Sequence, residues 1–494
     1  MAQKPQGAQL WIHVAGVYVA SVLASGILPV WPVVQPSLKA AGIFAECCDK
    51  GARGDGAGQP SSASCQEQDM MLGEVYMIGM SLLLAASWPI GIFFDARGPR
   101  QTTVLGCLFC LVGSLAVALA ASYPASMSWL IFPGAVLADV GSNMNSFGLY
   151  GFLWHFHERQ GFLSGLASST YSVSALFPLA LLSYLRLKTV LWLTAVLAGC
   201  ALVLCSCFVP TSAEYLSMAE EVLGHQSVAP GFALLPSIRS CWRVFKANCM
   251  DNLLFVISLL CMICGYQFYT AVASPFLTAL LHSEEASAQV MVVGSTLYGV
   301  IGFFLAPAAG YVVDALGMRM LVLGMNILNI VMAILIFIPN VMVQMLGSVA
   351  STLLSLLQMT YYSRWFALYA PPNHFGNFQG AVCSCCGVLS LLIQTGLQAL
   401  AAKTLSGLMT FVVPLCVLNA LTVLSGLVFS CHVARIELPV SPPVIDDDTP
   451  QDESVPTKAG RMGVELSAIP PCTDNVKARY KPVPSNSECR FMPL

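Results

Sequence analysis

Asp139 and Arg364 place charged side chains inside long apolar runs of the sequence. An ionisable group at membrane depth is unfavourable unless it is paired or faces a polar cavity, so both are candidate functional residues. Asp139 could hold its helix to a partner, bind a substrate amine or carry a proton. Arg364 could snorkel to the interface. Alternatively, it could face a cavity and pair with Asp139 or with a substrate carboxylate.

Uncharged polar side chains accompany these two charges at helical spacing. Amides and phenols can donate and accept hydrogen bonds, so they can bind a small polar substrate between apolar helices. For the aromatic residues, packing or an interfacial belt is the plainer interpretation. The candidate substrate-binding residues are Asp139, Asn143, Asn145, Tyr266, Gln267, Tyr269, Gln358, Tyr362 and Arg364.

The chain carries no motif of an enzyme or of an ATP-driven pump. It has no Walker loop, no G-x-S-x-G and no H-E-x-x-H. The nineteen cysteines are scattered, many of them in apolar segments, and show no zinc-ligand spacing, so we predict neither a cofactor nor a metal. No basic run indicates nucleic acid. The expected partners are a small-molecule substrate and the lipid bilayer, and we expect a monomer.

The elements that must position these residues are membrane helices. Hydrophobic residues make up 56% of the chain and charged residues 10%, against roughly 25% in soluble domains. A span needs about 20 apolar residues. On that ruler the sequence predicts an all-α polytopic membrane protein with twelve transmembrane helices, at about 8–36, 71–93, 101–122, 127–153, 160–184, 188–210, 252–280, 287–313, 318–339, 341–369, 375–400 and 406–432.

The spans divide into two pseudo-symmetric six-helix halves. We predict a first bundle at 1–210 with an outer loop at 37–70, a middle loop at 211–251, a second bundle at 252–432 and a disordered tail at 433–494. Lysines and arginines outside the tail favour a cytoplasmic location for both termini. In the outer loop, Cys65 could pair with Cys47 or Cys48, and the alternative is three free thiols. Within the middle loop, 212–221 could be a surface helix, and Arg239, Arg243 and Lys246 could meet anionic lipid or form a solvated face.

One ten-residue pattern, G-x-x-x-D-x-x-G-x-R, occurs at 91–100 and again at 310–319. Its first glycine allows a neighbouring helix to approach closely, and its second permits a tight turn. We expect the aspartate to lie where the helix leaves the membrane, and the arginine to face water and lipid phosphate. The repeated residues are Gly91, Asp95, Gly98 and Arg100 in the first copy, and Gly310, Asp314, Gly317 and Arg319 in the second.

The repeated loop resembles those between helices 2 and 3 and between helices 8 and 9 of the major facilitator superfamily. Within this superfamily, a second stretch narrows the resemblance. The P-x-x-H-F-G-x-x-x-G piece at 371–380 is similar to the corresponding segment of the solute carrier 43 family, to which apicomplexan amino-acid transporters are related. That resemblance implies a facilitator of large neutral amino acids or of purine nucleobases. It also implies that Asp95 with Arg100, and Asp314 with Arg319, gate the rocking of the two halves.

The resulting hypothesis is a uniporter in the plasma membrane that moves large neutral amino acids by alternating access. Asp139 and Arg364 stand where the resembled family would have small or apolar residues. A cationic amino acid or an internal ion pair therefore stays open. So do a purine nucleobase facilitator and a non-transporting sensor or scaffold that signals through its tail.

Overall fold

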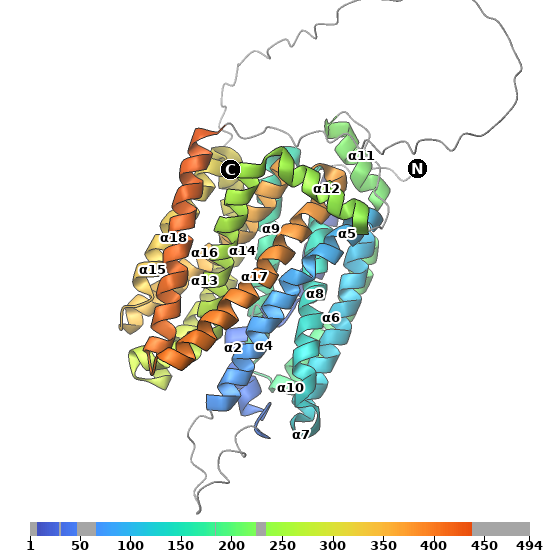
Figure 1. The fold of residues 1–494 in the computed structure, drawn as a ribbon. Coiled ribbons are helices and arrows are strands. Elements are labelled where there is room, and N and C mark those ends of the chain that lie inside the picture. Colours follow the sequence, from blue (N-terminus) through green and yellow to red (C-terminus); the bar gives the residue numbers. More distant parts are fainter. Residues whose placement is uncertain (1–6, 29–30, 47–65, 183, 224–233, 437–494) are drawn as a thin grey trace, which may run out of the picture. The chain divides into compact units, whose positions relative to one another are not determined.

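A computed structural model describes residues 7–28, 31–46, 66–182, 184–223 and 234–436. The regular secondary structure of these residues is helical (Figure 1). In chain order the helices are α1 (Ala8–Leu23), α2 (Trp31–Ala40), α4 (Gln66–Ala85), α5 (Ser87–Arg97), α6 (Pro99–Ser122), α7 (Pro124–Met127), η2 (Ser128–Leu130), α8 (Ile131–Tyr150), η3 (His157–Arg159), α9 (Gln160–Leu182), α10 (Leu187–Phe208), α11 (Ser212–Leu223), α12 (Leu234–Ala247), α13 (Cys249–Leu281), α14 (Glu284–Leu316), α15 (Met318–Leu335), α16 (Val341–Tyr369), η4 (Pro372–His374), α17 (Phe375–Thr404) and α18 (Met409–Arg435).

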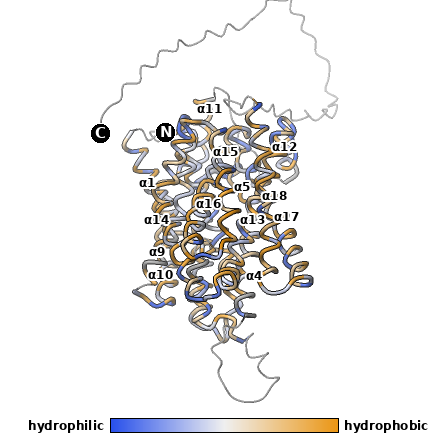
Figure 2. Tube along the Cα trace, turned by 90° about the vertical axis from the view of Figure 1, so that its left-hand side faces the viewer, coloured by the Kyte–Doolittle hydropathy of each residue, from blue (hydrophilic) through white to orange (hydrophobic). Residues whose placement is uncertain are grey.

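Nine helices in the described ranges are long and apolar enough to cross a membrane, counting α4 with α5 and η4 with α17. In Figure 2 hydrophobic residues predominate along the helices and hydrophilic ones gather toward their ends. The chain is therefore a multi-pass membrane protein. The other three predicted spans contain α1, α8 and α9, which lie outside that set of nine, so the count of twelve stays a prediction.

The predicted first span, 8–36, is not one helix. It divides into α1, only 16 residues long, and α2, which continues to Ala40. Gly26 and Pro29 fall in the interval between the two, where glycine and proline both disfavour a continuous helix. The predicted span at 8–36 therefore consists of two helices, and the interruption between them becomes part of the candidate site.

Helices from the two predicted halves pack directly on each other. We call the helices up to α10 the first half and those from α13 the second half. Across this division α9 packs along α14, and α17 packs along α4 and α5. All described residues nevertheless fall within one compact unit, so the division into two halves remains a prediction.

The repeated loops form the same turn twice. Gly98 ends α5 with φ 84°, and Gly317 ends α14 with φ 83°. Each is followed at once by the next helix, α6 or α15. A φ in this region is easily adopted only by glycine, which explains the second glycine of the pattern. The end of the bundle that carries these two turns is called the motif end below.

Several predictions concern residues outside the described ranges. The disulfide of Cys65 with Cys47 or Cys48 is one, and most of the tail at 437–494 is another. The middle loop, in contrast, contains two helices, α11 and α12. The helix expected at 212–221 is thus present and ends slightly later, at Leu223.

Candidate functional site

Asp95 binds the amino-terminal end of a helix in the opposite half. Its two carboxylate oxygens accept hydrogen bonds from the backbone N–H groups of Gly376 (2.9 Å) and Asn377 (2.7 Å), in the first turn of α17. A helix N-terminus has unpaired N–H groups and a partial positive charge, so a carboxylate is well suited to it. Asp95 is buried, with 7% of its surface exposed. The contact ties α5 to α17 at the motif end.

Asp314 makes the equivalent contact in the other direction. Its oxygens accept hydrogen bonds from the backbone N–H groups of Gly161 and Phe162, both at 2.8 Å, in the first turn of α9. Each copy of the repeated pattern therefore binds a helix of the half to which it does not belong. Unlike Asp95, Asp314 is only half-buried.

Glycines allow these helices to touch through their backbones. A Cβ atom on Gly91 would lie 1.9 Å from the carbonyl oxygen of Gly376, and one on Gly310 would lie 2.1 Å from that of Gly161. Any larger residue would push the helices apart. The first glycine of the pattern thus permits the approach that brings each aspartate to its helix terminus.

The two motif arginines each bind a helix end, and they differ in exposure: Arg319 is exposed, as expected for a residue that faces water, whereas Arg100 is half-buried. The Arg100 Nε donates a hydrogen bond to the Val209 carbonyl at the end of α10 (2.7 Å), and Arg319 donates to the Ile436 carbonyl just after α18. Both bind the carboxyl-terminal end of the last helix in their own half. A cation is favourable there because the final carbonyls lack partners within the helix.

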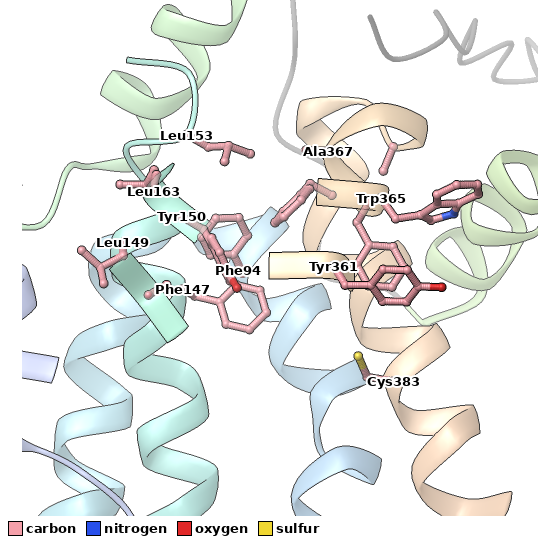
Figure 3. Packing of buried hydrophobic residues seen from close by; sticks show 14 of the residues in the cluster. Phe94, Phe147, Leu149, Tyr150, Leu153, Leu163, Tyr361, Trp365, Ala367 and Cys383 are labelled. Atoms are coloured by element: carbon pink, nitrogen blue, oxygen red, sulfur yellow. The ribbon is translucent and has the colours of Figure 1, made fainter. Parts of the chain in front are cut away.

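Buried aromatic side chains pack within each half at the motif end. Figure 3 shows Phe94, Phe147 and Tyr150 in the first half, and Tyr361 and Trp365 in a separate group in the second. The Tyr150 ring contacts the Phe375 ring across the division, with their centroids 5.8 Å apart. The Tyr150 hydroxyl and the Ser363 hydroxyl are 2.6 Å apart and hydrogen bonded across the division. This end of the bundle is closed by buried apolar packing together with the two carboxylate contacts.

Arg364 belongs to this closed end. Its Nη1 donates to the Gln160 side-chain oxygen at 2.5 Å, directly before the α9 turn that Asp314 binds. A pair with Asp139 does not form, because Asp139 contacts the first-span interruption instead. Arg364 therefore links the second half to the first near the motif end, and a cavity-facing role for it stays a prediction.

Asp139 holds the interruption between α1 and α2. One carboxylate oxygen accepts hydrogen bonds from the backbone N–H groups of Ile27 (2.9 Å) and Leu28 (3.1 Å). The Asn145 side chain donates to the Ala24 carbonyl at 3.0 Å. Asp139 is 1% exposed, and its second oxygen has no hydrogen-bond partner in the described part of the chain. These contacts satisfy backbone groups that lack helical partners, as irregular backbone within a membrane requires.

We expect Asp139→Ala to destabilise the protein more than Asp139→Asn does. Alanine leaves two buried amides unpaired, at about 1–3 kcal/mol each, whereas asparagine retains one acceptor oxygen. The thermal midpoint of the purified protein measures the loss. Gln358→Ala, on a half-buried side chain, serves as the control. Equal midpoints for Asp139→Ala and wild type would show that these bonds do not stabilise the fold.

Deeper between the halves lies a group of hydroxyl-bearing side chains. The Tyr76 phenol lies within reach of the Thr270 side chain across the division, and the Tyr266 and Tyr298 phenols lie nearby. We define the tyrosine cluster as Tyr76, Tyr171, Tyr266, Thr270, Tyr298 and Ser355. Tyr76 is buried, and the other five side chains are partly accessible.

The structure separates the remaining predicted substrate-binding residues. Tyr269 lies near Tyr266, and both are half-buried. Tyr362 lies near Tyr171 and Tyr298 of the cluster. In contrast, Gln267 is buried and accepts hydrogen bonds from Ser390 and Gln394 within its own half. The Asn143 side chain donates a hydrogen bond to the Ser87 hydroxyl at 3.1 Å, within the first half. Gln358 is half-buried.

Several residues at these contacts carry no signal in the sequence. Gln160, Ser363 and Asn377 are single polar residues near predicted helix ends, where polar residues are expected in any case. Tyr76, Tyr171 and Tyr298 do not stand out, because aromatic residues in apolar helices usually pack. No single tyrosine is distinctive, but tyrosines at similar depth in helices of both halves are a combined pattern from which the tyrosine cluster could have been predicted.

The helix α11 begins with a reciprocal cap. The Thr211 N–H and hydroxyl both donate to Glu214 (2.6 and 3.0 Å), and the Glu214 N–H donates back to Thr211 (3.3 Å). Partial burial alone would raise the pKa of Glu214. The hydrogen bonds from Thr211, with the nearby charge of Arg100, outweigh it and lower the pKa below its ordinary value of 4.5.

Acidification is therefore expected to release the start of α11. A carboxylate with a lowered pKa stabilises the folded arrangement above its unfolded pKa, and loses that contribution as the pH falls through the folded value. Amide exchange over 211–223, corrected for intrinsic rates, should rise between roughly pH 5 and pH 3. Glu214→Gln should remove this dependence, whereas Glu220→Gln, on an exposed residue, should retain it. A dependence unchanged in Glu214→Gln would exclude Glu214 as its cause.

The fold is that of the major facilitator superfamily. The proton:xylose symporter XylE of that superfamily, bound to 6-bromo-6-deoxy-D-glucose, is 13% identical with a TM-score of 0.58, covering 88% of this chain and 97% of the symporter chain. The human organic anion transporter MFSD10 (TETRAN) is 15% identical with a TM-score of 0.57, covering 86% of this chain and 100% of its own. No protein-family model matches the sequence.

One curated protein is similar to part of the chain. The large neutral amino acids transporter small subunit 3 of mouse (Mus musculus) is 29% identical over 124 residues. That match spans 25% of this chain and 22% of the relative.

Among the described residues, no group of three or more His, Cys, Asp or Glu side chains is arranged to hold a metal ion.

Proposed function

We propose that the protein is a facilitative transporter that works by alternating access of its two halves. The observation that carries this proposal is the reciprocal pair of contacts at the motif end, Asp95 with α17 and Asp314 with α9. Each joins opposite halves through hydrogen bonds that can break and re-form without loss of either half's own packing. Closure at the motif end then corresponds to one of the two end states, with the site accessible from the opposite side.

We propose large neutral amino acids as the substrates. The local similarity to a transporter named for such substrates supports this class. The tyrosine cluster also supports it, because hydroxyls can hydrogen bond the polar part of the substrate while the phenol rings contact an apolar or aromatic side chain. The substrate would bind between the halves, next to Tyr266 and Tyr298.

Uptake in oocytes tests the substrate class. Radiolabelled leucine and phenylalanine should be taken up, whereas arginine and adenine should not. Preference for adenine would favour a nucleobase facilitator, and preference for arginine a cationic amino acid carrier. Tyr298→Phe should weaken uptake by about threefold to tenfold if its hydroxyl contacts substrate. Phe304→Leu, an exposed residue of the same helix, is the control.

Two further measurements test for proton coupling and for a scaffold role. A proton-coupled carrier should show pH-dependent uptake that Asp139→Asn abolishes, because the unpartnered oxygen of Asp139 is a place to hold a proton. Deletion of residues 437–494 should leave uptake in reconstituted vesicles intact. Absence of uptake for all four compounds, with loss of a binding partner on this deletion, would favour a non-transporting scaffold.

A further inference from the structure

The helix α12 has two chemically distinct faces. Its inner face carries Val244, fully buried, and Ser240, 4% exposed. Its outer face carries Trp242, 62% exposed, together with the exposed cations Arg239 and Lys246. A tryptophan between basic residues on one side of a short helix is typical of helices that lie in the headgroup region of a membrane.

The position of α12 agrees with that composition. It ends at Ala247, and α13, which is long and apolar enough to span the membrane, begins two residues later at Cys249. Figure 1 shows α12 lying across the end of the bundle rather than along it. Met250, at the start of α13, is 58% exposed, so apolar surface continues from α13 to the level of Trp242.

The inner face of α12 is hydrogen bonded to the gate through Asn377. The side-chain NH₂ of Asn377 donates to the Ser237 carbonyl (2.7 Å) and to the Ser240 hydroxyl (3.0 Å) on α12. Its side-chain oxygen accepts from the Trp88 indole N–H of α5 (2.9 Å), and its backbone N–H donates to Asp95. One residue therefore joins α12 to both helices of the Asp95 contact.

Within the described residues, the Asp314 contact has no counterpart of this Asn377 connection. The position equivalent to Asn377 in the α9 turn is Phe162, which has no side-chain hydrogen-bonding group. Correspondingly, Asp95 is buried while Asp314 is half-buried. Through Asn377, α12 is hydrogen bonded to the α17 contact, so a ligand that fixes α12 is expected to act on that contact.

We propose that anionic lipid headgroups bind the outer face of α12, at Arg239, Trp242 and Lys246, and thereby stabilise the closed motif end through Asn377. The cations supply charge complementarity to the lipid, and Trp242 supplies the interfacial anchor. Lipid composition then sets the fraction of transporters that is closed at the motif end. This regulation goes beyond the proposed transport activity and does not depend on the substrate.

Amide hydrogen exchange of full-length protein in nanodiscs tests the proposal without a substrate. The amides of Gly376 and Asn377 are protected only while they bind Asp95. Their exchange should be on the order of fivefold slower in phosphatidylcholine with phosphatidylserine than in phosphatidylcholine alone. The Arg239→Gln/Lys246→Gln double variant should lose this difference. Arg186→Gln/Lys188→Gln, the same charge change on two exposed residues at the start of α10, should retain it.

Variants of the connection test the route. Asn377→Ala should still bind phosphatidylserine vesicles in a flotation assay but show no lipid effect on exchange at Gly376. Ser240→Ala, which removes one of the two α12 partners, should reduce the effect and covers the case in which Asn377→Ala does not fold. An undiminished lipid effect in both variants would overturn the proposed route.

Other outcomes overturn the binding claim itself. Equal exchange of wild-type protein in the two lipid mixtures would do so, as would a lipid effect that survives in Arg239→Gln/Lys246→Gln. The acidic run at 446–448 is an alternative occupant of the same cations. If deletion of residues 437–494 removes the protection of Gly376 in both mixtures, the tail is the ligand and the lipid proposal fails.

Discussion

Gly380→Ala is expected to disfavour closure of the motif end and to reduce uptake by about fivefold or more. A Cβ at this position would lie 2.3 Å from the Ser87 carbonyl oxygen of α5. That neighbour is backbone and cannot rotate away, so α17 must move off α5. Overpacking of this kind is unfavourable by about 1–3 kcal/mol. A shift of that size changes the open–closed equilibrium roughly fivefold to 150-fold.

The same helix offers a matched control. Gly396 also lies in α17, but a Cβ there would meet nothing within 4 Å. Gly396→Ala should therefore retain wild-type uptake, and its only expected effect is a gain in helix stability of about 0.5–1 kcal/mol. Uptake normalised to surface expression, with amide exchange at Gly376 and Asn377, measures both variants. Wild-type uptake and exchange in Gly380→Ala would contradict the role assigned to this contact.

The repeated pattern predicts local structure well and tertiary contacts poorly. The second glycine of the pattern predicts a turn, and this glycine has φ 84° at Gly98 and φ 83° at Gly317. Local rules are sufficient for this, because the requirement lies in the residue's own backbone. The partners of Asp95 are backbone amides some 280 residues later. Backbone donors have no side-chain signature, so the sequence alone gives no means of selecting α17.

The arginines illustrate the same limit. A cation after a turn at the membrane surface is ordinarily expected to face water, and Arg100 instead binds the carbonyl of Val209. The repeat contains a usable clue, since Arg100 and Arg319 recur at the same offset and each half ends in a long helix. Only the fold, however, brings the ends of α10 and α18 next to those arginines.

Polar residues at membrane depth stand out in the sequence, although their partners do not. Asp139 and Asn145 bind backbone groups of the interrupted first span. Gly26 and Pro29 are the residues in the sequence that disfavour a continuous helix there. A carboxylate in one apolar helix and a helix-breaking pair in another are complementary features. Only together do they indicate the contact, because a first span treated as continuous has no free backbone amides for Asp139 to bind.

Asp95→Ala is expected to shift the protein toward the state open at the motif end more strongly than Asp314→Ala. Hydrogen bonds to charged groups contribute roughly 1.5–3 kcal/mol each, and Asp95 forms two in a buried environment. Loss of both should change the open–closed ratio by about a hundredfold or more. Asp314 forms two bonds of similar length but is half-buried, so water replaces part of what is lost. Its removal should change the ratio by about tenfold.

Peptide-resolved amide exchange separates the two effects, because Gly376 and Asn377 report on one contact and Gly161 and Phe162 on the other. If both carboxylates stabilise a single closed arrangement, Asp95→Ala should also accelerate exchange at Gly161, where no bond was removed. Asp95→Asn, which keeps one acceptor oxygen, should fall between wild type and Asp95→Ala. Acceleration confined to α17 would mean that the two contacts open independently, and rocking of two halves as units would then be excluded. Because both contacts join the same two halves, coupled acceleration is the expected result.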